Sequence, residues 1–269
     1  MQVDIVERMF KSDDPMIRNA AIDFLRKLNT DYVGTLATLV DDKDKDIRKF
    51  VVDTLSDHSS KEAQSIVQSR LNDPAAVVRQ AAIEVLGRMG AKTAIPDIEK
   101  RLFEETNLMI RCTCLETLAE LGFSPSAPQI IQRISKEDNI MLVFSLLRYI
   151  GNLGTPEDLT VLESLFLNFG NTILKPLTRS AFNILQRYNT ILLPPAILQA
   201  IKNALDVEPD NNVAWELGRA LLFGMGKEGI ETARTMLNER MNGKRMAAAE
   251  YMDQFGSDED MKRVQEILR

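Results

Sequence analysis

A unit of thirty-odd residues recurs along this chain, and that recurrence constrains the fold more than any other feature of the sequence. Residues 77–90 read VVRQAAIEVLGRMG, which is an apolar residue and an arginine, two small residues, an acid, a leucine and a closing glycine. The same pattern fits residues 17–29, 47–59 and 110–122 and, near the other end of the chain, 244–256. Two helices of about 10–15 residues with short loops occupy this length, so each copy predicts one helix pair.

The leucine of the pattern defines an anchor position that extends the repeat over the whole chain. Successive anchors are 30 to 37 residues apart and fall at Leu25, Leu55, Leu86, Leu118, Ile150, Leu185, Leu222 and Met252. Each pair has an apolar face that it can bury only against the next pair. The sequence therefore predicts an all-α fold: a right-handed α–α superhelix, or solenoid, of about eight helix pairs with a closing C-terminal helix.

We expect a single domain over residues 1–269, with regular repeats in 1–155, irregular repeats in 156–227, and a regular repeat with its cap in 228–269. Asp-Pro steps at 14–15 and 73–74 are good helix starts, and Gly90 and Gly122 are good helix ends. The expected helices cover residues 3–11, 15–28, 31–40, 45–57, 60–71, 74–89, 93–103, 107–121, 126–135, 139–153, 156–167, 172–188, a segment opened by Pro194-Pro195, 212–223, 228–241, 244–255 and 257–268.

The repeat resembles HEAT repeats, specifically the short bacterial HEAT-like type named after phycobilisome lyases. The residues that carry the resemblance are Asp14, Arg18, Ala20, Ala21 and Leu25 in the first copy and Asp73, Arg79, Ala81, Ala82, Leu86, Gly87 and Gly90 in the third. Copies five to seven keep the length but have Val143, Thr178 and Trp215 in place of the arginine. The resemblance implies that the repeated aspartate and arginine pair across neighbouring repeats, and that the second helix of each pair lines the concave side.

Composition argues against several classes of function. A net charge of −6 disfavours a non-specific nucleic-acid binder. The longest apolar run, residues 140–147, is too short for a membrane span, and the first ten residues do not form a secretory signal, so we expect a cytoplasmic protein. The chain begins and ends within the repeat phase, which is typical of a module of a longer protein.

The sequence predicts no catalytic residue, no cofactor site and no metal site. His58 is the only histidine, which removes a histidine metal cluster and leaves no plausible partner for a serine or cysteine nucleophile. Cys112 and Cys114 are two positions apart on one helix and cannot reach each other; we expect Cys114 in a small buried position and Cys112 nearer the concave groove.

The position two residues before the anchor is acidic in the first four copies, at Asp23, Asp53, Glu84 and Glu116. On second helices these acids would form a stripe in the groove, a docking site for a basic segment of a partner. The simpler interpretation is a solvated helix face supported by pairs such as Asp23–Lys27 and Glu84–Arg88.

The next section of the groove is basic and aromatic. Arg148, Lys175, Arg179 and Arg187 fall on or near successive second helices, close in sequence to Phe144, Tyr149 and Tyr188. Such a surface can hold an acidic peptide or stack bases, or it can be packing in an irregular stretch. Trp215, the only tryptophan, is either a binding hot spot or the filler of a longer repeat.

The function most consistent with these features is a non-catalytic scaffold or adaptor that binds a protein partner in its groove. Two alternatives belong to other classes. One, implied by the resemblance, is a bilin lyase or lyase-like chaperone, which needs an apolar cavity the size of a tetrapyrrole. The other resembles the HEAT-like alkylpurine DNA glycosylases and needs a basic groove, which the acidic column disfavours.

Overall fold

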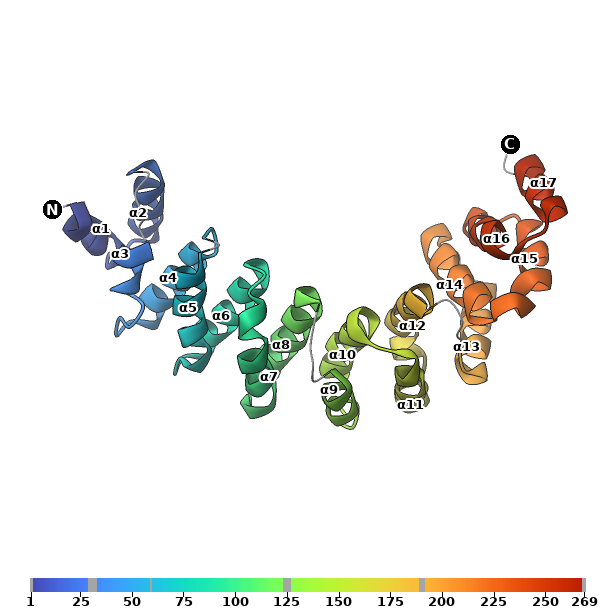
Figure 1. Ribbon diagram of the computed structural model, residues 1–269, viewed down its shortest axis with the longest axis horizontal. Helices are drawn as coiled ribbons and strands as arrows, with labels where there is room; N and C mark the ends of the chain where they lie inside the picture. The colour runs from blue at the N-terminus through green and yellow to red at the C-terminus, as the bar shows by residue number, and fades with distance from the viewer. Residues whose placement is uncertain (1, 29–32, 59, 123–126, 189–191, 268–269) are drawn as a thin grey trace. The chain divides into compact units, whose positions relative to one another are not determined.

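The computed structural model describes residues 2–28, 33–58, 60–122, 127–188 and 192–267, and every regular element within these ranges is a helix (Figure 1). Contacts between Cα atoms divide the chain into two units, Met1–Ser124 (unit 1) and Pro125–Arg269 (unit 2). Each unit is a series of two-helix repeats. The predicted all-α solenoid class is confirmed for both.

Unit 1 contains four helix pairs, in which a first helix is followed by a second helix of the same repeat. Short 3-10 turns, η1 and η2, extend two of these elements at Arg70–Asn72 and Lys92–Ala94. The helices are α1 Gln2–Phe10, α2 Pro15–Leu28, α3 Val33–Ala37, α4 Lys45–Leu55, α5 Lys61–Ser69, α6 Ala76–Arg88, α7 Ile95–Glu104 and α8 Leu108–Leu121.

Unit 2 continues the same alternation and adds a closing helix, α17. Its 3-10 turns are η3 Pro156–Asp158, η4 Gly170–Ile173 and η5 Gly226–Gly229. The helices are α9 Ala127–Ile134, α10 Ile140–Leu153, α11 Leu159–Phe169, α12 Leu174–Tyr188, α13 Pro195–Val207, α14 Asn211–Gly224, α15 Ile230–Leu237, α16 Asn242–Phe255 and α17 Asp258–Ile267.

Most predicted helix ends lie within three residues of those in the structure. The helix predicted over 228–241 is too long, since α15 ends at Leu237, and two further differences have local reasons. The helix predicted over 31–40 is wrong in length: residues 31–32 lie outside the described ranges, and α3 gives way after Ala37 to turns in which Thr38 and Leu39 bond back three residues. The helix predicted from Pro74 begins at Ala76, because the Asp73 carboxylate accepts the N–H of Ala75 and holds the chain in a turn. Gly90 and Gly122 end their repeats with positive φ, as predicted.

The second helices form a continuous layer in each unit. In unit 1 α4 packs on α6 and α6 on α8; in unit 2 α10, α12, α14 and α16 pack in sequence (Figure 1). Small residues allow the close approach, since a Cβ on Gly87 would lie 2.9 Å from Cγ2 of Thr117, and one on Gly218 would lie 2.9 Å from Cβ of Ala247.

The core of each repeat is built from the anchor and its apolar neighbours. Every anchor whose side chain the structure describes is buried: Leu55, Leu86, Leu118, Ile150, Leu185, Leu222 and Met252. Ala81 and Ala82, the small pair of the third copy, are buried as well. The side chain of Leu25 lies outside the described part. The repeat pattern therefore identified the core correctly.

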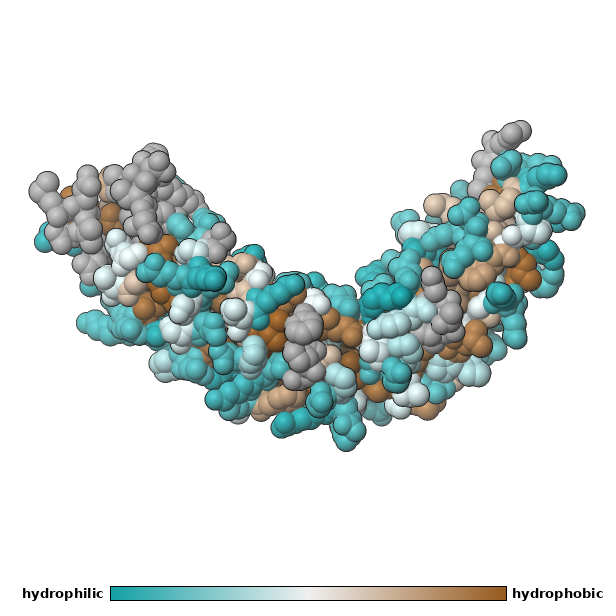
Figure 2. Space-filling view, in the orientation of Figure 1, coloured by the Kyte–Doolittle hydropathy of each residue, from teal (hydrophilic) through white to brown (hydrophobic). Residues whose placement is uncertain are grey.

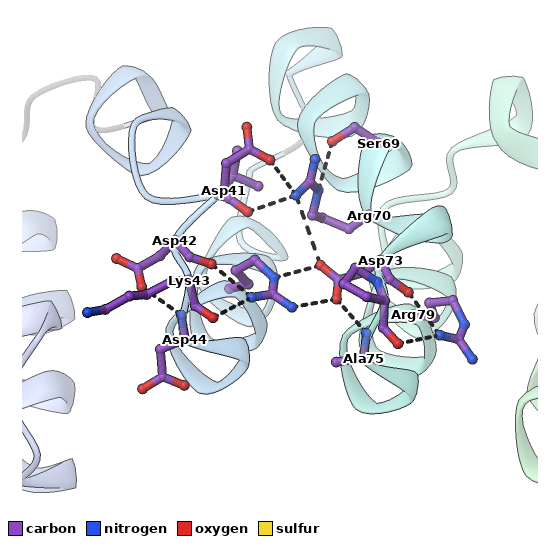
Figure 3. A network of polar contacts seen from close by, with 12 residues as sticks. Asp41, Asp42, Lys43, Asp44, Ser69, Arg70, Asp73, Ala75 and Arg79 are labelled. Carbon is purple, nitrogen blue, oxygen red and sulfur yellow. Dashed lines mark hydrogen bonds and ion pairs between the residues drawn. The ribbon is translucent and has the colours of Figure 1, made fainter.

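A buried ion pair joins the second repeat to the third. Arg48 of α4 donates from Nε and Nη2 to the two carboxylate oxygens of Asp73, at 2.7 and 2.8 Å, and its Nη1 donates to the carbonyl of Asp42 at 2.8 Å. The Asp73 side chain is fully buried and Arg48 is 8% exposed. Figure 3 shows this network around Asp73, with Arg70 bonding to Asp41 beside it. The pair implied by the resemblance is confirmed.

The third and fourth repeats are joined in the same way. Arg79 donates from Nε and Nη2 to Glu105, at 2.8 and 3.1 Å, and from Nη1 to the carbonyl of Asp73 at 2.8 Å. Arg18 also donates from Nη1 to a carbonyl six residues earlier, that of Ser12. Each of these arginines thus ties down the loop before its own helix, while Arg48 and Arg79 also bond to the next repeat.

The acids of these pairs keep their charge against the effect of burial. Burial alone would raise the pKa of Asp73, but hydrogen bonds from Arg48 and from the N–H of Ala75 outweigh it and lower the pKa below the ordinary value of 3.8. The pKa of Glu105 is lowered from 4.5 in the same way, by Arg79 and by two backbone N–H groups. In unit 2 Arg234 forms a bidentate pair with Asp260 and lowers the pKa of that carboxyl.

We expect Asp73→Ala to destabilise unit 1 by about 3–5 kcal/mol, because it leaves the Arg48 guanidinium buried without its carboxylate. The double replacement Arg48→Met/Asp73→Leu should recover most of this loss, since it removes both charges together. Urea unfolding followed by far-UV circular dichroism measures the change. The fluorescence of Trp215 reports unit 2 and should shift much less. If Asp73→Ala lowered the free energy of unfolding no more than the double replacement does, the role given to the pair would be contradicted.

Stability should fall as the solution is acidified below about pH 4.5. Asp73, Glu105 and Asp260 have lowered pKa values in the folded state, so the folded chain binds fewer protons than the unfolded chain in this range. Their contribution is complete above the ordinary pKa values and is lost as the pH falls through the folded ones. Urea midpoints between pH 7 and pH 3 test this: Asp73→Asn/Glu105→Gln should depend less steeply on pH than the wild type, and equal slopes would refute it.

Candidate functional site

Each second helix leaves one stripe of residues towards solvent, which we call the open stripe. It comprises the positions nine, six and two before the anchor and two after it, although Ala220 and Gly224 of α14 and Gly243 of α16 are buried at these positions. On α6 these are Val77, Gln80, Glu84 and Arg88, whereas Val78, Ala81 to Ile83, Val85 and Leu86 are buried. Steps of three and four residues keep one face of a helix, so the stripe is the single face that packing leaves uncovered.

The predicted acidic residues lie on open stripes of unit 1. Asp53, Glu84 and Glu116 occupy the same stripe position on α4, α6 and α8 and are partly exposed, and Asp23 of α2 is exposed. Asp53 accepts from Lys49 Nζ at 2.6 Å, and Glu84 accepts from Gln80 at 3.0 Å, both within one helix turn. The expected pair Glu84–Arg88 is replaced by Glu84–Gln80. Such exposed contacts contribute little to stability, so the acids are not needed for the fold.

The open stripes of α4, α6 and α8 are strongly acidic as a group. The charged residues at the four stripe positions of these repeats are six acids and two bases: Asp46, Asp53, Asp57, Glu84, Glu116 and Glu120 against Lys49 and Arg88. Because α4, α6 and α8 pack side by side, these carboxylates lie on adjacent helices of one surface.

Three of the four predicted basic residues, Arg148, Arg179 and Arg187, lie on open stripes of unit 2, and Arg179 and Arg187 form bonds within the protein. Arg179 of α12 donates to both oxygens of Glu216 on α14, at 2.8 and 2.9 Å. Arg187 donates to the carbonyls of Gly151 and Gly154, at 2.6 and 2.7 Å, and so covers the last turn of α10. Arg148 is exposed on the stripe of α10. The packing interpretation is therefore the better one for Arg187.

Two residues of the predicted basic and aromatic surface, Tyr149 and Lys175, are not where they were expected. Tyr149 does not contribute to the surface, because it is completely buried, whereas Phe144 and Tyr188 are exposed as expected. Lys175 of α12 lies outside the open stripe and pairs with Glu208 at 3.2 Å. An apolar residue beside a surface arginine in sequence is turned by about 100° around the helix, which is enough to place it in the core.

Trp215 is partly exposed and contacts Glu250 and Arg219. Its Nε1 donates to Glu250 at 3.2 Å, and the guanidinium of Arg219 lies 4.3 Å from the ring centroids of both Trp215 and Phe182. Arg219 also pairs with Glu250 at 3.0 Å. These residues border a cavity of 220 Å³ that is lined by Arg179, Phe182, Asn183, Gln186, Trp215, Glu216 and Arg219. Trp215 therefore fills the irregular repeat and still faces a small depression.

The cysteines are poor nucleophiles. Cys114 is completely buried, and burial raises the pKa of its thiol to about 12, so it carries no thiolate near neutral pH. Cys112, which was expected nearer the groove than Cys114, occupies a stripe position and is also buried. Within the described ranges no three histidine, cysteine, aspartate or glutamate side chains gather as a metal site would require. In the same ranges no helix has the length and apolar character of a membrane span.

One set of surface residues was missed by the sequence reasoning. The position nine before the anchor carries an exposed apolar side chain in four of the first five copies: Met16 (79% exposed), Val77 (43%), Met109 (49%) and Met141 (45%). Asp46 occupies it in the second copy. The recurrence of apolar residues at one repeat position is visible in the sequence in the same way as the acidic column. Figure 2 shows that apolar surface is interspersed with polar surface over the helices of each unit.

Comparison with known proteins supports the architecture. A family described as HEAT repeats matches residues 3–87, 33–111 and 67–143, which together span more than half of the chain. None of the curated proteins matches the sequence. The complex of CpcE and CpcF of phycocyanin lyase from Nostoc sp. PCC7120 is similar in structure, with a TM-score of 0.51, 15% identity, and coverage of 88% of this chain and 93% of that one.

Two further structures are more distant. Human deoxyhypusine hydroxylase in complex with glycerol has a TM-score of 0.38, 14% identity, and coverage of 94% of this chain and 96% of its own. An engineered protein has a TM-score of 0.44, 14% identity, and coverage of 88% and 98%. At such identities the likeness to the lyase complex shows the fold alone. The repeat pattern, the Arg–carboxylate pairs between repeats and the family match together show that this chain belongs to the HEAT-repeat family.

Proposed function

We propose that the protein is a non-catalytic scaffold that binds a protein partner on the open stripes of its second helices. The observation that carries the proposal is the carboxylate at one stripe position of α4, α6 and α8, in Asp53, Glu84 and Glu116. HEAT repeats suggest protein interaction in general. Asp53 and Glu84 lie outside the buried Arg–carboxylate network and form their recorded contacts within single helices, so a partner can bond to them without loss of the fold.

The charge of this surface selects the partner. Six acids against two bases at the stripe positions of three adjacent helices favour a basic protein segment and repel a polyanion such as DNA. One exposed ion pair contributes about 0.2–1 kcal/mol, so a row of them gives orientation and a fast association more than a high affinity. Apolar contacts must supply the remainder. A DNA-repair role finds no support in this surface.

Cys112 and Cys114 form no disulfide with each other, which suits a reducing compartment, and we propose a cytoplasmic location on that ground.

Reversing the charge of two stripe acids should weaken the binding of the partner. In a pull-down from the native host, the variant Glu84→Lys/Glu116→Lys should capture at least about tenfold less of the basic proteins that the wild type captures, because repulsion between like charges replaces attraction. Arg148→Glu tests unit 2 separately, and capture should weaken as salt rises because the contacts are exposed.

The matched control is Glu62→Lys/Glu104→Lys, which makes the same charge change on the first helices α5 and α7 and should capture the wild-type set. If neither Glu84→Lys/Glu116→Lys nor Arg148→Glu alters the captured set, the open stripes are not the binding surface.

One observation favours a second candidate, the handling of a bilin. A cavity of 620 Å³ lies between α11, η4, the start of α12 and α13, and its lining is largely apolar: Phe166, Leu174, Ala196, Ala200, Ala204 and Val207, with Lys175, Asn171, Gln199, Asn203 and Glu208 at polar positions. Its volume falls within the range of small-molecule sites, about 300–1,000 Å³.

Biliverdin titration decides this alternative. If the cavity holds a tetrapyrrole, the absorption spectrum of biliverdin should change saturably at one equivalent, and Ala200→Phe, which fills the cavity, should abolish the change. Ala127→Ser on α9 is the control outside the cavity. An unchanged spectrum with wild type would remove the bilin candidate and leave the scaffold proposal intact.

A further inference from the structure

Two parallel rows of different chemistry cross unit 1. Val77 and Glu84 lie seven residues apart on the open stripe of α6, and Met109 and Glu116 lie seven apart on that of α8. Seven residues return to nearly the same face of a helix and advance about 10 Å along it. An apolar row and an acidic row therefore run side by side across adjacent helices.

The apolar row is a property of the repeat rather than scattered surface hydrophobicity. Val77 and Met109 occupy the same repeat position on neighbouring helices that pack on each other, and both are nearly half exposed. Isolated exposed apolar residues are common, but regular recurrence makes them adjoin. Val77 and Met109 lie in the first turns of α6 and α8, whereas the anchors that hold the core lie nine residues further on.

We propose that unit 1 binds one amphipathic basic helix of a partner protein, laid across α4, α6 and α8 with its apolar edge on Val77 and Met109 and its basic edge on Glu84 and Glu116. The proposal rests on the function proposed above and adds the conformation and the apolar half of the partner. Charge complementarity fixes the occupant, since an acidic or purely apolar helix would leave the carboxylate row opposite like charge or opposite hydrocarbon.

The spacing of the layer sets the spacing of residues in the partner. Neighbouring packed helices are about 8–10 Å apart, and seven residues of a helix cover about 10 Å. The partner should therefore present one apolar residue to each second helix at intervals of seven, with lysine or arginine three or four residues from each. The flexible side chain of Met109 suits apolar residues of different shape.

The α4 end of the surface gives the partner a direction. Asp46 replaces the apolar residue there, and Asp53 continues the acidic row, so both rows are acidic on this helix. The bound helix should carry an additional basic residue at the end that lies over α4, whereas at the corresponding positions over α6 and α8 it should carry apolar residues. This asymmetry distinguishes the two orientations of the partner.

Selection of helical peptides from a displayed random library on the whole chain tests the proposal. The expected peptides combine lysine or arginine with leucine, isoleucine, phenylalanine or methionine at seven-residue spacing. Fluorescence anisotropy with a selected peptide should then show at least about tenfold weaker binding to Val77→Ser/Met109→Ser and to Glu84→Gln/Glu116→Gln. The matched control, Leu167→Ser/Val207→Ser, removes two exposed apolar residues from α11 and α13 and should bind as wild type.

Each result separates this inference from the proposed function. Basic peptides that need Glu84 and Glu116 but not Val77 and Met109 would overturn the amphipathic helix and leave the acidic scaffold standing. Peptides unaffected by either double variant, or acidic peptides, would overturn both. If sedimentation shows a dimer of the wild type that Val77→Ser/Met109→Ser dissociates, the occupant is a second copy of the chain and the proposal is wrong. Circular dichroism of each variant establishes that it is folded.

Discussion

The bidentate bond between a buried or half-buried arginine and a buried carboxylate of the next repeat is the interaction on which the regular part of this solenoid depends. Arg48 with Asp73 and Arg79 with Glu105 each use Nε and Nη2 for the next repeat and Nη1 for a carbonyl of their own. A planar guanidinium satisfies these acceptors together only in one register. Sliding one repeat along its neighbour would leave a charge buried without its partner, which costs far more than a shifted apolar contact.

A fixed register also determines what reaches the surface. Because the repeats joined by these pairs meet in the same way, a given position has a similar environment in the copies of unit 1, and similar residues at that position form a row across the layer. The anchors form the buried row, and the stripe positions form exposed ones. The candidate site is therefore a consequence of the packing: Asp53, Glu84 and Glu116 need no local structure of their own to lie on adjacent helices.

The fold could be predicted from the sequence because its signals are local or periodic. The anchors, the helix ends at Gly90 and Gly122 and the acidic column all follow from spacing, and the structure places them as expected. Glu105 was not predicted as the partner of Arg79, because it is a glutamate where the third copy has Asp73. Both acids nevertheless lie two positions before the N-cap residue of their helix, which is Ala75 for Asp73 and Asn107 for Glu105. The acceptors of Arg187, the carbonyls of Gly151 and Gly154, depend on the distance between two helices of an irregular repeat, which no spacing in the sequence encodes.

The two units solve the same packing problem differently, and this bears on where a partner would bind. The copies that lack the repeated arginine have Val143, Thr178 and Trp215 in its place. Their contacts between repeats include a buried hydrogen bond from Ser180 Oγ to the carbonyl of Leu147 and several exposed or part-buried bonds: Arg179 with Glu216, and Trp215 and Arg219 with Glu250. A partner on unit 2 would have to compete with these internal bonds. In unit 1 the contacts between repeats are buried at Arg48 and Arg79, and the contacts recorded for Asp53 and Glu84 lie within single helices. A partner there can bond to Asp53 and Glu84 without breaking the Arg–carboxylate bonds between repeats, which is why we place it on unit 1.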